Sequence, residues 1–341
     1  MPFMHRITGR PARTRARRSA LVVGAAAALA ATLVGCGSSS SSSSAAGSGG
    51  SGVTNITLGV VAGNSQENAY VAQAKGFFKQ HGLNAKFTVL TGGGAEAVAA
   101  IEGGSMTMAE GNIVSVLQGA QHGIDTPCFA GGVGFNTKGN AYAIVGAKGV
   151  TSAKQLAGKG VAVISDNSAN TLLVDAWLQA NGVDYKSVKD VIVTPPNMQA
   201  TLQHGSALAA AAPDPFSSQI LQSSGTMLSR DPDQYIAGHP LFACWQASSK
   251  WLAGNQKVVR EFIAAMNQAD AYEAAHPAAA NAAAAPLMKV SAKSLDGLIP
   301  WKFTMSMSQK DITSWENVGK KFGVLSGSVK MPDVYDPVSG S

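Results

Sequence analysis

Five short polar segments hold most of the side chains that could bind a small molecule, and each follows an apolar segment of the chain. Our candidate ligand-binding residues in these segments are Asn64, Gln66, Gly93, Gly94, Asn112, Ser165, Asn167, Asn170, Asp214 and Phe216. Amide and hydroxyl groups supply donors and acceptors, and glycines let backbone N–H groups approach a ligand closely. The same polar residues could instead cap helices, and the glycines could form an ordinary strand-to-helix turn. Both interpretations remain open.

The charged residues in these segments are acidic. Glu67, Glu110, Asp166 and Asp214 follow predicted strands, whereas the two arginines beyond residue 36, Arg230 and Arg260, do not. An anion held by a bidentate arginine is therefore disfavoured. We predict a small ligand that is polar and neutral, zwitterionic or amine-bearing, and we expect aromatic residues such as Tyr70, Phe216 and Trp245 to contact it or to fill the core.

Motifs for catalysis or metal binding are missing from the sequence. It contains no Gly-x-Ser-x-Gly, His-Glu-x-x-His or Cys-x-x-Cys pattern, and the glycine run lacks the spacing of a nucleotide-binding loop. Three histidines, His81, His122 and His204, each precede a glycine, which is typical of helix C-termini. We therefore predict no catalytic residue, no metal and no cofactor.

Composition indicates a packed globular protein that does not bind nucleic acid. The chain has 341 residues, of which 45% are apolar and 13% charged, with a formal net charge of +6. Six arginines before Cys36 account for that excess, and the remaining 20 basic and 20 acidic residues balance. The neutral main part offers no basic surface for nucleic acid.

The N-terminus has the pattern of an export signal. An arginine-rich stretch precedes the apolar residues 21–34, which are too few to span a bilayer, and Leu33-Val-Gly-Cys36 resembles a bacterial lipobox. We predict a signal peptide over 1–35, lipidation of Cys36 and a flexible Ser/Gly-rich tether over 36–53. The protein would then be extracytoplasmic and lipid-anchored to the bacterial cell membrane. An uncleaved anchor, and twin-arginine rather than general export, remain open.

From residue 54 onward, apolar segments alternate with amphipathic ones, which predicts an α/β protein with parallel strands. We expect a first lobe over 54–147, a second over 148–240, and a helical return to the first over 241–341. The predicted strands 141–147 and 241–247 connect the lobes, which leaves a ligand cleft between them. Cys128 and Cys244 form either a disulfide or two buried free thiols. The expected strands are 56–61, 86–90, 106–109, 127–130, 160–164, 191–194 and 207–211, and the expected helices are 68–80, 95–102, 113–121, 171–180, 198–204, 216–223, 258–272, 278–287 and 308–321.

Several segments in order resemble those of a known family. These are Ile56-Thr-Leu-Gly, Ala74-Lys-Gly-Phe-Phe-Lys-Gln-His-Gly-Leu83, Gly103-Gly-Ser-Met-Thr-Met108, Leu156-Ala-Gly-Lys-Gly-Val-Ala-Val163 and Ala210-Ala-Ala-Pro-Asp-Pro-Phe216. The chain is similar to the nitrate/sulfonate/taurine-type substrate-binding proteins of ABC importers, which share their fold with thiamine-pyrimidine-synthesis-like proteins.

The resemblance implies a type II periplasmic-binding-protein-like fold with two lobes and two crossover strands. It also implies a monomer that captures a small molecule by hinge closure and delivers it to an ABC permease. Two alternatives are a ligand-sensing domain that presents solute to a membrane partner and an enzyme of the same fold. The pyrimidine-synthesizing relatives use a Cys-rich run that this sequence lacks.

Overall fold

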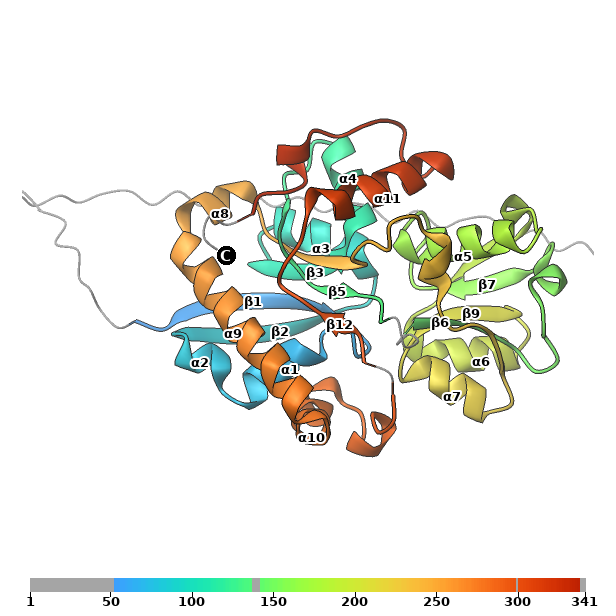
Figure 1. Ribbon diagram of the computed structural model, residues 1–341, viewed down its shortest axis with the longest axis horizontal. Coiled ribbons are helices and arrows are strands. Elements are labelled where there is room, and N and C mark those ends of the chain that lie inside the picture. The colour runs from blue at the N-terminus through green and yellow to red at the C-terminus, as the bar shows by residue number, and fades with distance from the viewer. Residues whose placement is uncertain (1–51, 137–141, 299, 338–341) are drawn as a thin grey trace, which may run out of the picture. The chain divides into compact units, whose positions relative to one another are not determined.

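The computed structural model describes residues 52–136, 142–298 and 300–337. Cys36, the predicted signal peptide and nearly all of the predicted tether lie outside the described residues. The main part of the chain contains two five-stranded sheets with helices packed on them (Figure 1). The predicted α/β class is confirmed. Among the described residues, no helix has both the length and the apolar character that crossing a bilayer would need.

The first sheet has the strand order β2-β1-β3-β11-β4, with β1, β2 and β3 parallel and β11 antiparallel to both of its neighbours. Its strands are β1 (Thr54–Val61), β2 (Leu83–Leu90), β3 (Met108–Asn112), β4 (Cys128–Gly131) and β11 (Ala243–Gln246). Pairing with β11 extends β3 as far as Asn112. Glu110 and Asn112 therefore lie in the strand, and the predicted strand end at residue 109 is wrong.

Four helices follow the parallel strands of the first sheet. They are α1 (Glu67–Ala74), α2 (Phe77–Gln80), α3 (Gly93–Glu102) and α4 (Ile113–Gln121). The prediction of one helix over 68–80 is wrong, because Gly76 adopts a φ of 76° and separates α1 from α2. His81, His122 and His204 are the C-cap residues of α2, α4 and α6 (Met198–Gln203), as predicted.

The second sheet has the order β10-β6-β9-β7-β8, in which β9, β7 and β8 are parallel. Its elements are β6 (Tyr142–Gly146), β7 (Gly160–Val163), α5 (Ala169–Ala180), β8 (Lys189–Ile192), α6 (Met198–Gln203), β9 (Ala209–Pro213), α7 (Phe216–Gln222) and β10 (Thr226–Ser229). Strand β9 forms from an alanine-rich run because its residues are all buried between helix layers. The edge strand β10 was not predicted, since its residues are only half-buried and do not alternate.

The chain passes between the two sheets twice. Strand β5 (Val133–Gly134) pairs with β12 (Lys302–Phe303), and the next strand, β6, already lies in the second sheet. After β10 the chain returns to β11 in the first sheet.

The C-terminal part is helical, as predicted. Its helices are α8 (Ser249–Gly254), α9 (Gln256–Ala275), α10 (Pro277–Met288) and α11 (Gln309–Lys321). The capping box that opens α11 is present, with the Ser308 N–H donating to Asp311 Oδ2 at 2.9 Å. Helix α9 packs on α1, α2 and α10, whereas α11 packs on both α4 and α5. Because α4 follows the first sheet and α5 the second, α11 joins the helix layers of both.

Five aromatic side chains gather where the two passages meet, and we call them the waist cluster. Phe242 lies at its centre, with ring centroids 5.6 Å from Phe135, 5.8 Å from Tyr142, 5.6 Å from Trp301 and 6.4 Å from Trp315. Phe135 and Tyr142 flank the first passage, and Phe242 ends the second. The cluster therefore fixes both connections against the C-terminal segment by burying aromatic surface.

A disulfide joins Cys128 in β4 to Cys244 in β11, across 116 residues of sequence. Both residues are fully buried, and the loop closed by the bond contains the entire second sheet. A bond that closes so long a loop restricts the unfolded chain strongly.

Replacing both cysteines, Cys128→Ala and Cys244→Ala, should lower the free energy of unfolding by about 2 to 4 kcal/mol, because the unfolded chain regains the freedom that the disulfide removes. Urea denaturation followed by circular dichroism measures this change. A reductant should lower the unfolding midpoint of the unmodified chain and leave that of the double variant unchanged. Equal midpoints for the unmodified chain with and without reductant would contradict the prediction.

Candidate functional site

The carboxyl ends of strands from the two sheets converge on one region. The backbone N–H of Asn64, after β1, donates to the carbonyl oxygen of Asp214, after β9, at 3.2 Å. The Ala169 N–H, at the start of α5, donates to Asn112 Oδ1 at 3.5 Å. In open parallel sheets, ligands bind beyond the carboxyl ends of the strands. We call this region the cleft.

The cleft contains a small cavity of about 40 Å³. Among the residues that line it are five of the ten candidates, namely Gln66, Gly93, Gly94, Asn112 and Asn170. Three aromatic residues of the waist cluster, Tyr142, Phe242 and Trp301, line it as well. A volume of this size holds only a few water molecules, so the cleft is closed.

Several polar atoms at the cleft are buried and have no hydrogen-bond partner. Gln66 Oε1, Tyr142 Oη and Asn170 Oδ1 belong to this set, and their residues are at most 4% exposed. Ser165 Oγ is a fourth such atom, and it would lie 3.7 Å from a Cβ placed on Gly93. Native proteins satisfy nearly all buried polar groups, so those left over require an explanation, such as a functional role or a bound water or ion. The cleft thus offers amide, hydroxyl and phenol groups to a polar molecule.

The two glycines are required by close packing at the cleft. Gly93 has a φ of 66°, which side chains rarely adopt. A Cβ on Gly94 would lie 2.5 Å from Asn112 Nδ2 and 2.6 Å from Ser115 Oγ. Asn112 also caps α4, because its Oδ1 accepts from the Ser115 N–H at 3.0 Å. Asn112 therefore has both of the roles considered for it, a cap and a cavity wall.

The other five candidates do not line this cavity. Asn64 accepts a 3.0 Å hydrogen bond from Trp301 Nε1 and faces a different cavity, described below. Asn167 is exposed with a φ of 45°, and Phe216 is half-buried at the start of α7. Asp214 Oδ1 accepts from the hydroxyls of Ser217 and Ser218 and from the Ser218 N–H, so its carboxylate caps α7. Ser165 follows β7 and is half-buried.

Sequence reasoning missed the aromatic lining. The candidates were selected because they follow predicted strands, which we call the strand-end rule. This rule did not select Tyr142, Phe242 and Trp301, because they lie next to the inter-sheet passages rather than after parallel strands. Tyr70 and Trp245, considered as wall residues, instead pack in the core of the first sheet against Phe87 and Phe262. These residues could have been found in the sequence from the presence of aromatic residues next to both inter-sheet passages.

A second cavity of about 570 Å³ adjoins the cleft, and we call it the acidic chamber. Its lining residues come from the start of α1, the end of α9, the beginning of α10 and the segment before and including β12. Trp301 lines both cavities, and its hydrogen bond to Asn64 lies between them. Three buried or half-buried carboxyl groups line the chamber, those of Glu67, Asp270 and Glu273.

Burial determines the charge state of these acids. Loss of solvation raises the pKa of Glu67 to about 7 and that of Asp270 to about 6. For Glu273, burial together with the charges of Glu67 and Asp270 raises the pKa to about 9. Glu110, behind the chamber in β3, is almost fully buried, and this holds its pKa well above the usual range despite a hydrogen bond from Gln66. Among the described residues, no group of three or more His, Cys, Asp or Glu side chains is arranged to hold a metal ion.

Comparison with known proteins agrees with this architecture. Residues 49–288 match the NMT1-like family, and the chain belongs to it. No curated protein matches the sequence significantly. The fold is that of periplasmic binding proteins.

Solved structures with this fold share little sequence with the chain. The alkanesulfonate-binding protein SsuA from Xanthomonas axonopodis pv. citri, bound to MOPS, is 17% identical over 83% of this chain and 98% of its own, with a TM-score of 0.68. The nitrate-binding protein NrtA from Synechocystis PCC 6803 is 14% identical over 83% and 86%, with a TM-score of 0.67. The desulfurization enzyme DSZB is 14% identical over 83% and 96%, with a TM-score of 0.58. Most such neighbours are binding proteins, and one is an enzyme.

Gly94→Ala should destabilise the cleft, because the added methyl group overlaps Asn112 and Ser115 and displaces the cap of α4. We expect a loss of about 1 to 3 kcal/mol in the free energy of unfolding, measured by urea denaturation. Gly254→Ala is the matched control, since a Cβ there meets nothing within 4 Å. If both variants unfold at the same urea concentration, the close packing around Gly94 is not as described.

The stability of the protein should fall as pH rises from about 5 to about 9. Glu67 and Glu273 have higher pKa values folded than unfolded, so the folded chain binds more protons in this interval and unfolding becomes easier with each step in pH. Thermal unfolding monitored across this range tests the slope. Glu273→Gln removes one titrating group and should reduce the slope between pH 5 and 9, whereas an unchanged slope would show that Glu273 ionises normally.

Proposed function

We propose that this protein is the extracytoplasmic solute-binding component of an ABC importer and that its solute binds in the cleft. The observation that carries the proposal is the set of buried, unpartnered polar atoms on Gln66, Tyr142 and Asn170, which line one cavity between the carboxyl ends of two sheets. Membership of the NMT1-like family and the fold shared with SsuA and NrtA support it.

Solute entry requires the cleft to open, because a cavity of about 40 Å³ admits no organic molecule. Opening would rotate the second sheet and its helices away from the first sheet about the two passages, which lie between β5 and β6 and between β10 and β11. The Asn64 to Asp214 and Ala169 to Asn112 hydrogen bonds would break, while the waist cluster and the disulfide would stay on the hinge side. Closure around solute would restore these contacts, and the closed shape would dock on the permease.

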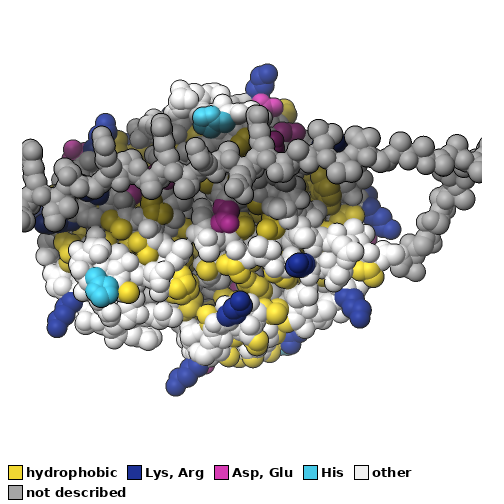
Figure 2. Space-filling model, turned by 180° about the vertical axis from the view of Figure 1, so that it is seen from behind, with side chains coloured by type: hydrophobic (Ala, Val, Ile, Leu, Met, Phe, Trp, Pro, Cys, Tyr) yellow, Lys and Arg dark blue, Asp and Glu magenta, His cyan; other side chains and the backbone are white. Residues whose placement is uncertain are grey.

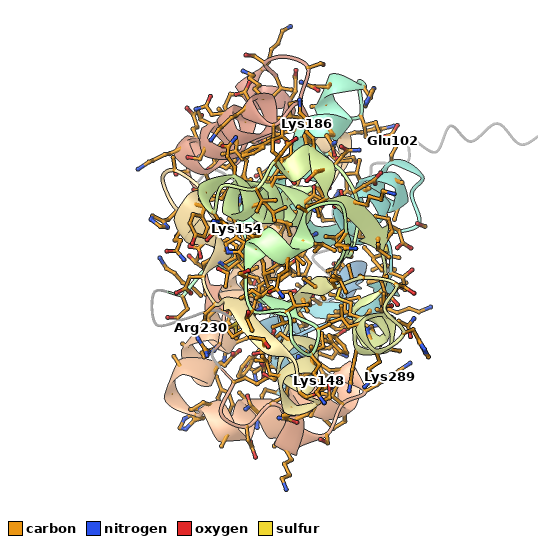
Figure 3. The ribbon with its side chains drawn as sticks, turned by 90° about the vertical axis from the view of Figure 1, so that its right-hand side faces the viewer. Glu102, Lys148, Lys154, Lys186, Arg230 and Lys289 are labelled. Carbon is orange, nitrogen blue, oxygen red and sulfur yellow. A yellow bond between two sulfur atoms is a disulfide. The ribbon has the colours of Figure 1, made fainter. Side chains whose placement is uncertain are left out.

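The chemistry of the cleft favours a neutral polar, zwitterionic or amine-bearing solute. No arginine or lysine lines its cavity among the residues that the structure describes. Arg230, which follows β10, and Arg260 on α9 are both exposed, and Figure 3 labels Arg230 on the side of the second sheet. Basic side chains are spread singly over the face drawn in Figure 2. A sulfonate or nitrate would have only amide, hydroxyl and backbone donors here.

The predicted export signal and Cys36 place this function at the membrane. A lipid on Cys36 and a tether over 36–53 would keep the binding domain close to the permease without fixing its orientation. A sensor that presents solute to a membrane partner would use the same residues, and genes for a permease and an ATPase beside this one would favour the importer. The enzyme DSZB has the same fold, so recovery of the solute unchanged after binding distinguishes a receptor from an enzyme.

Asn170→Ala should weaken solute binding, because the solute would lose its hydrogen bond to Asn170 Oδ1. We expect a loss of about 1 to 3 kcal/mol, which is about 5- to 150-fold in Kd. The solute is first identified by a thermal-shift screen of amino acids, amines, polar heterocycles, alkanesulfonates and nitrate, and affinity is then measured by calorimetry.

Gln179→Ala is the control for this test, since Gln179 is an exposed residue on the same helix, α5. It should bind solute as the unmodified chain does. Unchanged affinity in Asn170→Ala would exclude the cleft as the binding site. Micromolar binding of nitrate or an alkanesulfonate, with no response to amines or heterocycles, would refute the proposed solute class.

A further inference from the structure

We propose that the acidic chamber is a second binding site, separate from the cleft, and that it takes an organic ammonium ion. The proposal does not depend on delivery of solute to a permease, because it rests on residues of the first lobe alone. Its supports are the unpartnered carboxylate atoms, the shape and lining of the chamber, and its charge.

Two glutamates of the chamber are more than nine-tenths buried and each has an oxygen without a hydrogen-bond partner. Glu67 is 5% exposed and Glu273 is 8% exposed, and the unpartnered atoms are Glu67 Oε1 and Glu273 Oε2. A buried carboxylate without a donor is costly, so proteins pair such groups. An ammonium group between α1 and α9 would supply N–H donors and positive charge to both.

The lining indicates an organic cation. The chamber, at about 570 Å³, has the volume of an organic-ligand pocket. Two aromatic rings, those of Trp301 and Phe303, form part of its wall, and aromatic faces attract ammonium groups. The Trp301 N–H is already used by Asn64, so Trp301 contributes apolar ring surface and no further donor to the wall. The described residues contain no cluster suited to a metal ion.

The charges that surround the chamber come mainly from acids. Glu67 is contributed by α1, Asp270 and Glu273 by α9, and Asp296 by the segment before β12, while α10 contributes only Pro277, Ala278 and Asn281. Lys302 is the basic residue of the lining, and it is exposed. His276, at the end of α9, is exposed and packs against Tyr272. Asp270 also accepts a 2.7 Å hydrogen bond from Asn68, which leaves the two glutamates as the acids in need of a partner.

Binding of a cation should depend on pH. The raised pKa values of about 7 for Glu67 and about 9 for Glu273 mean that both acids are largely protonated below pH 6. A cation favours their ionised forms, so its binding releases protons and its affinity rises with pH between about 6 and 9. A simple amine stays protonated over most of this range, since its own pKa is about 10.

The test is calorimetric titration of the full 341-residue chain with 1,4-diaminobutane and with tetramethylammonium, and with 1,4-butanediol as the neutral analogue. We expect at least one of the two cations to bind, the diol to give no binding heat, and the affinity for the cation to be about tenfold higher at pH 8 than at pH 6. No binding by either cation, or equal binding of the diol, would overturn the proposal.

Variants locate the site. Glu273→Gln and Glu67→Gln should each lower the affinity for the bound cation about tenfold or more and reduce its pH dependence. Glu102→Gln is the matched control, because Glu102 is exposed at the end of α3 (Figure 3), and it should bind as the unmodified chain does. Thermal unfolding at pH 8 verifies folding, and Glu273→Gln should unfold at an equal or higher temperature since it removes a buried acid.

The cleft variant Asn170→Ala separates this proposal from the proposed function. It should leave the affinity for the cation unchanged. If Asn170→Ala abolishes cation binding while Glu273→Gln does not, the cation occupies the cleft, which overturns the second site and leaves the solute-binding function standing. Loss of cation binding in Glu273→Gln alone supports the chamber even where no cleft solute is found.

Discussion

The waist cluster is the interaction on which the arrangement of the two sheets depends. Phe135, Tyr142 and Phe242 flank the two passages of the chain, and Trp301 and Trp315 come from the C-terminal return. Together with α11, which packs on both α4 and α5, this shared aromatic surface defines the angle between the sheets. Three of these rings, those of Tyr142, Phe242 and Trp301, also line the cleft cavity, so residues that hold the sheets together also shape the site.

The site in turn depends on polar groups that the fold buries without partners. Folded proteins normally pair such groups, because an unsatisfied donor or acceptor reduces stability. Here Gln66, Tyr142 and Asn170 surround the cleft, and Glu67 and Glu273 line the adjacent chamber. Other unpartnered atoms, such as those of Gln246 and Thr126, lie outside these two cavities, so it is the position of these five residues in a cavity wall that associates them with ligands.

Much of the fold could be predicted from the sequence because each element carries a local signal. The alternation of apolar and amphipathic segments predicted the parallel strands, and glycine after histidine predicted three helix ends. Elements set by tertiary contacts were less accessible. Strand β3 extends through Glu110 and Asn112 because β11, more than 130 residues later in the sequence, pairs with it. The break at Gly76 depends on one left-handed residue inside a helical pattern.

The candidate site could be predicted only in part, for a related reason. The strand-end rule selects residues by their neighbours in sequence, and it found Gln66, Gly93, Gly94, Asn112 and Asn170 around one cavity. It could not distinguish these from Asp214, whose carboxylate is used by Ser217 and Ser218 of its own helix. Nor could it associate Glu67 with Asp270 and Glu273, which lie more than 200 residues away.

Trp301 connects the packing of the two sheets with the two cavities. It belongs to the waist cluster, lines both cavities and donates a hydrogen bond to Asn64. Asn64 also holds Asp214 of the second sheet through its backbone N–H. The proposed opening of the cleft would release the bond from Asn64 to Asp214 and leave that from Trp301 to Asn64 intact, because both residues belong to the first lobe. The chamber would then keep its shape while the cleft opened and closed, which is the condition for two sites with separate ligands.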